Sequence, residues 1–477
     1  MSDPTVFRFL FAAGSVGTDA FRVAKVIGSE AISEPFTFEI DAVVVSADGA
    51  AIREVLGARG RLGFQAPQGR QIGGIVTRIE ALAMVDGPEL QLYRFRLAPT
   101  LWLLSRRKTS RIFQDMSVPE IVRAVLSCVR IQQDWQTEGS YPKREYCVQY
   151  HASDLDFVTR LCAEEGIFYF IADPAAEDAD AQETVVFADS VSAYRRIAGN
   201  SRLPHRNTGA LQGGEQVASF SFGKEIRSNA TLHRSFDFKR PSFDLRGEAR
   251  LGNGHGDIDL AELSVYEHDG DPEEDRIHGA GAKASLEQLR ARAETGFGES
   301  DCQRLALAAT FELENHHHDD LGKGYTVVRI DHEIHQVVAR LVSSVETPTY
   351  KNRFHCVPER VAFRPDRPRR ELHQITETAT VVGPSGEEIH VDAYGRIKVQ
   401  FHWDLQGKND ERSSCWLRTM QSWAGAGWGS QFIPRIGMEV VVTFVQGDVD
   451  RPLVLGTVYN AGAPVPFVLP ASATQSG

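Results

Sequence analysis

Cysteine is scarce in this chain of 477 residues, and its six cysteines lie far apart. No two of them form the Cys-x-x-Cys spacing of zinc knuckles and redox motifs, and they are not clustered as in a small disulfide scaffold. The sequence therefore predicts neither a zinc knuckle nor a disulfide framework. We expect six reduced, buried thiols, at Cys128, Cys147, Cys162, Cys302, Cys356 and Cys415.

Long apolar runs are also missing. The first residues, MSDPTVFRFLFAAGSVGTDA, lack the basic start and apolar stretch of a secretory signal. No later stretch approaches the roughly 20 apolar residues that span a bilayer. We therefore expect a chain that begins in the cytoplasm. Its 42% hydrophobic residues can fill real cores, and its length suggests about three domains.

Excess positive charge and complete catalytic motifs are absent too. The 52 basic and 64 acidic side chains give a formal net charge of −12, which works against a nucleic-acid partner. GPSGE at 383–387 lacks the last glycine of a nucleophile elbow, and no P-loop lysine follows a glycine-rich loop. The adjacent Glu164 and Glu165 are better explained as a solvent-facing helix end than as a glycosidase acid and base. We predict no catalytic site and no cofactor.

Four histidines are the candidates for a metal site. His316 and His318 belong to a run of three histidines, and His332 and His335 follow downstream, where a hairpin could bring the two groups together. However, HEIH is one residue short of the HExxH motif, and the surrounding residues are strand-like. We therefore predict no bound metal, with these four histidines as the alternative.

What the chain has instead is many short strands. In GRIKVQFHWD, which begins at Gly395, apolar and polar residues alternate, as in a strand with one buried face. Further strands are expected at 415–420, 439–445 and 453–459. Four or five strands joined by Gly, Asp and Pro turns within about 80 residues suit a small closed barrel.

A glycine-rich loop, QSWAGAGWGSQFIPRIG, separates the second and third of these strands. Its glycines permit unusual backbone angles or close approach to another surface. Trp423 and Trp428 in this loop are either anchors that contact another chain or side chains that close the barrel ends. The sequence leaves both interpretations open.

Helix-start signals occur in the middle of the chain. Ser117 followed by Glu120 is a capping box, and an apolar stripe follows it. Ser153 with Asp156 begins a second helix, which we expect to end at Gly166. A third helix is expected around 282–294.

The run EIHVDAYGRIKVQFHWD, with the later SSCWLRTMQSWAGAGWGSQFIPRIGMEVVVTFVQGDVDRPLVLGTVYN, resembles the oligonucleotide/oligosaccharide-binding (OB) segment of the VgrG family. VgrG is the valine-glycine repeat spike protein of bacterial type VI secretion, related to the puncturing device of contractile phage tails. RIFQDMSVPEIVRAVL and REYCVQYHASDLDFVTRLCAEEGIFYFI resemble the same family. Within the OB segment, the resemblance marks a set of structural or interaction residues: Trp423, Gly427, Trp428, Pro434, Arg435, Gly447 and Asp448.

Pattern and resemblance together predict a mainly β fold with an α+β insert. The expected parts are a hub β-barrel (1–100), an α+β hub segment (101–180), a second hub β-barrel with a helical insertion (181–370), an OB barrel (376–460) and an extended leader (461–477). The leader contains three prolines and no alternating run, so we expect a truncation that lacks the C-terminal β-helix needle.

The resemblance implies a structural protein rather than an enzyme. A homotrimer would cap the hexameric Hcp tube, carry a PAAR-repeat tip protein and effectors, and cross a target membrane mechanically. It would assemble in the cytoplasm and be secreted by the type VI system without a signal peptide. Without the needle, the chain should engage the tube ring but fail to hold the PAAR cone. The alternatives are the tail hub of a phage-like contractile particle, and an effector enzyme whose catalytic part is missing or unrecognised.

Overall fold

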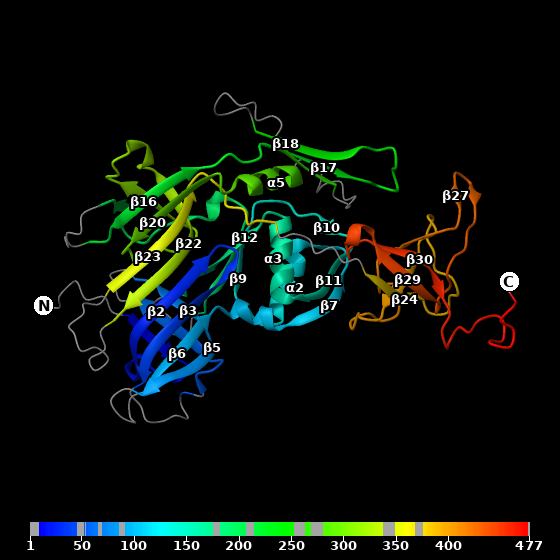
Figure 1. The fold of residues 1–477 in the computed structure, drawn as a ribbon, viewed down its shortest axis with the longest axis horizontal. Coiled ribbons are helices and arrows are strands. Elements are labelled where there is room, and N and C mark those ends of the chain that lie inside the picture. The colour runs from blue at the N-terminus through cyan, green and yellow to red at the C-terminus, as the bar shows by residue number, and fades with distance from the viewer. Residues whose placement is uncertain are drawn as a thin grey trace.

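The computed structural model shows an elongated molecule with a β-sheet hub at one end, an OB domain at the other and an α+β segment between them (Figure 1). The residues it describes are 9–44, 52, 54–64, 69–84, 91–174, 182–206, 214–251, 263–268, 280–336, 349–367 and 375–475.

The hub is built on one continuous sheet of 13 strands. The first half contains, in spatial order, β1 (Phe9–Ala13), β4 (Arg59–Phe64), β5 (Gln71–Met84), β6 (Gln91–Ala98), β3 (Glu34–Val44) and β2 (Phe21–Ala31). The second half continues with β22 (Gly324–His335), β23 (Thr349–Pro358), β20 (Glu294–Ser300) and β16 (Val217–Lys224). Three more strands complete the sheet: β21 (Ala309–Glu314) pairs with β22, and β14 (Arg195–Arg196) and β15 (Arg202–Pro204) pair with β21.

The two halves are joined by β2 and β22. These strands pair antiparallel, with Lys25 opposite His335 at one end and Ala31 opposite Arg329 at the other. The hairpins β2–β3 and β22–β23 therefore lie side by side, and the order β3-β2-β22-β23 has a two-fold pattern (Figure 1). The two predicted hub barrels correspond to the two halves of this sheet. Each half has its own apolar core, built around residues such as Phe11 and Phe95 in the first half and Phe311 and Phe354 in the second.

The α+β segment packs on the core of the first half. Helix α2 (Val118–Ser127) begins with the predicted capping box, in which the Glu120 side chain accepts from the Ser117 amide at 2.7 Å. Helix α3 (Asp154–Glu164) begins as predicted at Ser153, whose hydroxyl accepts from the Asp156 amide at 3.0 Å. Gly166 has φ 71° just after the helix, a conformation that favours glycine.

The other elements of this segment are short. Strand β11 (Cys147–Ser153) pairs with β7 (Lys108–Phe113), and β8 (Met116–Ser117) pairs with β10 (Lys143–Arg144). Short 3-10 helices among the described residues are η1 (Thr18–Ala20), η2 (Thr100–Arg106), η3 (Val191–Ala193), η5 (Asp319–Leu321) and η6 (Val445–Gly447).

The boundary expected at residue 180 differs from the structure. Strand β13 (Thr184–Ala188), expected in the second barrel, lies between β12 (Phe168–Ala172) and β9 (Gln133–Gln136) in the α+β segment. The Phe187 ring stacks on Trp135 at 4.4 Å, which fixes β13 against β9. These pairings between distant parts of the chain are not visible in local sequence patterns.

Glu164 and Glu165 are not solvent-facing as we predicted. Arg144 lies between them, donating to Glu164 at 2.8 Å and to Glu165 at 2.7 Å, and all three side chains are largely buried. The prediction was wrong because the cation that neutralises this helix end comes from a strand about twenty residues earlier.

The insertion in the second half is a small layer of its own. It contains β17 (Ala230–Ser235), β18 (Leu245–Arg250), β19 (Ser264–His268) and the predicted helix, α5 (Ala280–Arg290). The Thr231 hydroxyl donates to the Ala282 carbonyl at 2.9 Å, which ties strand to helix. Strand β17 was expected in the barrel but pairs with β18 and β19.

The OB domain contains a five-stranded sheet in the order β25-β24-β29-β30-β26. Its strands are β24 (Thr376–Val382), β25 (Lys398–Phe401), β26 (Arg418–Thr419), β29 (Glu439–Phe444) and β30 (Pro452–Val458). The predicted apolar face is confirmed, since Ile397, Val399 and Phe401 are buried in its core, but Gln400, expected on the polar face, is buried as well. The strand expected at 415–420 is shorter in the structure, where it covers only Arg418–Thr419.

Beyond β30, the described residues to 475 form turns and no strand. No helix among the described residues is long and apolar enough to span a membrane. All six cysteines are free thiols. The expectation that all six are buried was wrong for Cys128, which is exposed, and for Cys415, which is partly exposed.

Candidate assembly surface and hub network

The loop with the two tryptophans forms a small exposed hairpin of β27 (Ala424–Gly425) and β28 (Trp428–Gly429). The turn is made at Gly427, which has φ 79° and open space around it. A Cβ added at Gly425 would lie 2.4 Å from the Trp428 indole, so glycine is needed there for the ring to cover the hairpin.

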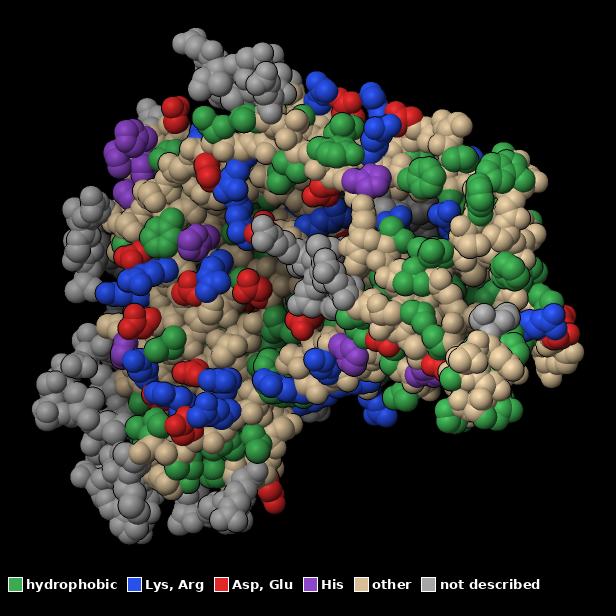
Figure 2. All heavy atoms as spheres, turned by 45° about the vertical axis from the view of Figure 1, so that its right-hand side comes forward, with side chains coloured by type: hydrophobic (Ala, Val, Ile, Leu, Met, Phe, Trp, Pro, Cys, Tyr) green, Lys and Arg blue, Asp and Glu red, His purple; other side chains and the backbone are tan. Residues whose placement is uncertain are grey.

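Both indoles face outward. Trp423 is 66% exposed and Trp428 is 61% exposed, and their rings meet edge to face at 5.6 Å between centroids. The interpretation in which they close the barrel ends is therefore wrong. Apolar side chains gather over this end of the molecule (Figure 2), and further exposed apolar residues of the OB domain are Leu405, Met420, Phe432, Leu455, Val458 and Tyr459.

The other OB residues marked by the sequence divide into two groups. Arg435 is exposed and forms an ion pair with Glu388. Pro434, Gly447 and Asp448 are buried. Gly447 has φ 73°, and the Asp448 carboxylate accepts from the Asp450 amide at 3.1 Å, so residues of the turn itself determine its conformation. These three residues hold the fold, whereas the hairpin presents a surface.

Asp450 connects the OB domain to the α+β segment, and sequence reasoning missed it. Its carboxylate accepts from the Val148 amide of β11 at 2.6 Å. On the same strand, the Tyr150 hydroxyl donates to Glu377 at 2.5 Å, and the Tyr150 ring meets Trp403 edge to face. The acidic turn QGDVDRP shows that Asp450 is available to accept hydrogen bonds, but the amide that it binds lies about 300 residues earlier in the chain.

The insertion also reaches the OB domain. Phe238 lies beneath the guanidinium groups of Arg396 and Arg418, at 5.3 and 4.9 Å from its ring centroid. Its ring also meets Tyr394 edge to face at 5.5 Å. The OB domain is therefore held both by the α+β segment and by the insertion of the hub.

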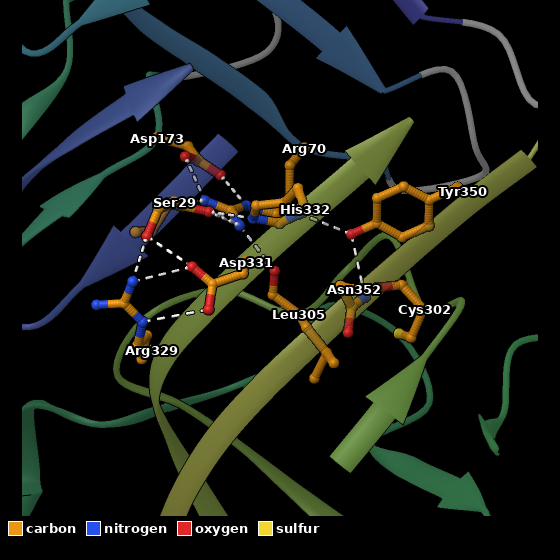
Figure 3. Close-up of polar contacts among 11 residues, drawn as sticks. Ser29, Arg70, Asp173, Cys302, Leu305, Arg329, Asp331, His332, Tyr350 and Asn352 are labelled. Carbon is orange, nitrogen blue, oxygen red and sulfur yellow. Dashed lines mark hydrogen bonds and ion pairs between the residues drawn. The ribbon is translucent and has the colours of Figure 1, made fainter. Parts of the chain in front are cut away.

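A buried ionic network joins the two halves of the hub sheet and the α+β segment. Arg70, just before β5, donates to Glu30 of β2 at 2.8 and 2.9 Å and to Asp173 at 2.7 and 3.0 Å. Its third acceptor is the Leu305 carbonyl, at 2.7 Å (Figure 3). One guanidinium thus satisfies groups from three regions of the chain.

His332 extends this network into the second half. One ring nitrogen lies 2.8 Å from Glu30, and the other lies 2.9 Å from the Tyr350 hydroxyl (Figure 3). Asn352 donates to that hydroxyl at 3.0 Å. Burial alone would raise the pKa of Glu30, but Arg70 and His332 outweigh burial and lower the pKa to about 2. The carboxylate is therefore charged at neutral pH.

The four candidate metal ligands do not come together. Both nitrogens of His332 have partners in the ionic network, and His335 lies 3.1 Å from Glu333. His316 and His318 lie in the turn before β22, whereas His332 lies near its far end, on the order of 25 Å away at the rise of a strand. His316 instead lies beside His317 and His205, and no sequence pattern had singled out His205.

Comparisons with known proteins agree with this architecture. Residues 29–338 match the family described as phage tail baseplate hub (GPD), and residues 387–459 match the type VI secretion system/phage-baseplate injector OB domain. The E. coli c3393 protein, described as a type VI secretion component similar in structure to the T4 tail proteins gp27 and gp5, superposes with a TM-score of 0.67. That alignment has 20% identity and covers 94% of this chain and 99% of the other.

Relatives among curated proteins are spike proteins of Pseudomonas aeruginosa. VgrG4b is 36% identical over 95% of this chain and 56% of its own length. VgrG1a is 32% identical over 97% of this chain and 71% of its own length. The chain thus spans between about half and just over two thirds of these relatives.

A hub sheet followed by an injector OB domain defines a baseplate-hub protein of the phage-tail type. The identity to the curated relatives is more specific. The chain belongs to the VgrG family of type VI secretion system spike proteins.

Proposed function

We propose that this chain is a structural subunit of a type VI secretion spike, in which three copies form the hub and the OB collar. The observation that carries the proposal is the group of exposed apolar side chains on the OB domain, which includes Trp423, Trp428 and Phe432. Large exposed apolar side chains gathered on one folded domain are typical of a protein interface. The family membership supports the same function.

The hub supports a three-fold assembly on a six-membered ring. The order β3-β2-β22-β23 gives each chain two similar half-sheets. Three chains would present six similar surfaces, which matches the symmetry of a hexameric Hcp ring. A PAAR-repeat protein and effectors would be carried beyond the opposite, OB-proximal end, on a C-terminal needle. This spike would assemble in the cytoplasm and leave the cell through the type VI system.

The proposed work is mechanical, without a catalytic step, cofactor or bound nucleic acid. The buried carboxylates Glu30, Glu164 and Glu165 are all paired with arginine, which suits a structural role. A hub of a phage-like contractile particle would use the same surfaces. That alternative is distinguished by its ring partner.

The mass in solution tests this proposal. Light scattering on the purified chain should give about three times 52.8 kDa. The double variant Trp423→Ser/Trp428→Ser should weaken the trimer without lowering monomer stability, because both side chains are exposed. Arg435→Ser changes an exposed ion pair nearby and is the matched control. A dimer, or a monomer at all micromolar concentrations, would contradict the proposal; pull-down with Hcp rings then tests the ring partner.

A further inference from the structure

Three imidazoles meet at the end of the hub sheet. His316 and His317 lie in the turn between β21 and β22, and His205 follows β15. The ring centroids of His205 and His316 are 4.6 Å apart, and those of His316 and His317 are 4.3 Å apart. One ring nitrogen from each of the three residues lies within 4.8 Å of the others.

The backbone holds these rings in place. The His205 amide donates to the Glu314 carbonyl at the end of β21, at 2.7 Å. Asn315 then turns the chain with φ 59° and delivers the histidine run directly opposite His205. The arrangement therefore follows from strand pairing between β15 and β21 and not from a chance side-chain rotamer.

His316 has an unsatisfied atom. Its side chain is only 7% exposed, and its Nε2 has no hydrogen-bond partner among the described residues. Its Nδ1 accepts from the His318 amide at 3.1 Å, so the neutral ring carries its proton on Nε2, where no acceptor lies. A buried polar atom without a partner is costly and requires an explanation.

We propose that His205, His316 and His317 bind a divalent transition-metal ion, with Zn²⁺ as the representative of the class. Neutral imidazole suits Zn²⁺, Ni²⁺ and Cu²⁺, and three protein ligands leave a fourth position for water or for His318, whose ring is 4.3 Å from that of His317. Two nitrogens bound tetrahedrally to zinc are about 3.3 Å apart, so the rings must close by rotation from their present spacing.

Coordination through Nε2 of His316 satisfies the orphaned atom. The neutral ring then changes tautomer: Nε2 binds the metal without its proton, and Nδ1 carries a proton instead. A protonated Nδ1 cannot accept, so the hydrogen bond from the His318 amide to Nδ1 is lost. The ion would tie β15 to the β21–β22 turn.

Zinc titration of the full chain, prepared without a histidine tag and followed by calorimetry and elemental analysis, tests this site. One ion per chain is expected. Loss of an outer-shell partner already weakens metal sites about 10–100-fold, so His317→Ala should weaken binding by at least about 100-fold. Because the His317 side chain is exposed, His317→Ala should fold normally, and a folding defect would not account for the weaker zinc binding. His335→Ala, which removes an exposed histidine on β22, is the matched control and should bind like the parent.

Two further measurements constrain the ligands. Cobalt should give the visible absorption of a tetrahedral nitrogen site in the parent and not in His205→Ala. Zinc affinity should fall as the pH is lowered, because protons compete for the imidazoles. The absence of stoichiometric zinc in the parent would overturn the proposal. So would equal binding by the parent and His317→Ala.

Discussion

Replacement of Arg70 by methionine tests whether the buried network joins the halves of the hub. Methionine keeps much of the side-chain volume but leaves the carboxylates of Glu30 and Asp173 and the Leu305 carbonyl without their shared donor. Removing one partner of a buried ion pair costs about 3–5 kcal/mol. We expect a loss in this range for Arg70→Met.

The pKa of Glu30 gives a second measure of the same interaction. Arg70 and His332 outweigh burial and lower this pKa from 4.5 to about 2, a difference equivalent to about 3 kcal/mol of stability at neutral pH. Because the folded-state pKa is the lower one, this contribution is present above pH 4.5 and is lost as the pH falls towards about 2. Burial raises the pKa of Asp173, which opposes the gain, so about 3 kcal/mol is an upper value.

The assay is denaturant unfolding of the hub at several pH values. Arg94→Met is the matched control, because Arg94 also makes a bidentate pair, with Asp41, but is 38% exposed; its loss should cost at most about 1 kcal/mol. Glu30→Gln should lose the acid dependence between pH 4.5 and about 2. If Arg70→Met and Arg94→Met unfold at the same denaturant concentration, the network does not join the halves.

Two other predictions concern single side chains. Native protein should react rapidly with a thiol reagent at Cys128, which is exposed, and Cys128→Ser should abolish this fast reaction. Burial raises the pKa of the Cys147 thiol to about 12, so that thiol should react slowly. Rapid labelling of Cys147 would contradict the packing of β11. Asp450→Ala should cost about 1–3 kcal/mol, because it leaves the Val148 amide without its acceptor, and limited proteolysis should then release an OB fragment sooner than from the parent. Unchanged release would show that the other contacts suffice.

Local sequence signals predicted local structure well. The helix starts at Ser117 and Ser153 depend on residues three positions away, so a short window contains all the information. The alternation around Val399 likewise identified the buried face of an OB strand. The resemblance then supplied the order of hub and OB domain, which the family matches confirm.

Long-range pairing was beyond these signals. Nothing near β2 indicates that it pairs with β22, about 300 residues later, or that β13 joins the α+β segment. The same applies to charged residues. Glu30 and Arg70 each look like ordinary polar residues of surface strands, and their burial follows only from the joining of the two sheet halves. His205 was missed for the same reason, since its partners lie in a turn over 100 residues away.

The two joints of the molecule are built differently, and this bears on how it can transmit force. The halves of the hub share continuous strand pairing and a buried guanidinium, whereas the OB domain is held by polar contacts from turns, such as Asp450 to Val148, and by the Phe238 ring. Among the described residues, no strand of the OB domain pairs with a strand of the hub, so we expect tension along the long axis to open that joint before the hub sheet splits. Compression along the same axis presses the OB domain onto β11 and the insertion. In the proposed spike, a push from the base would therefore load this joint in the direction that closes it.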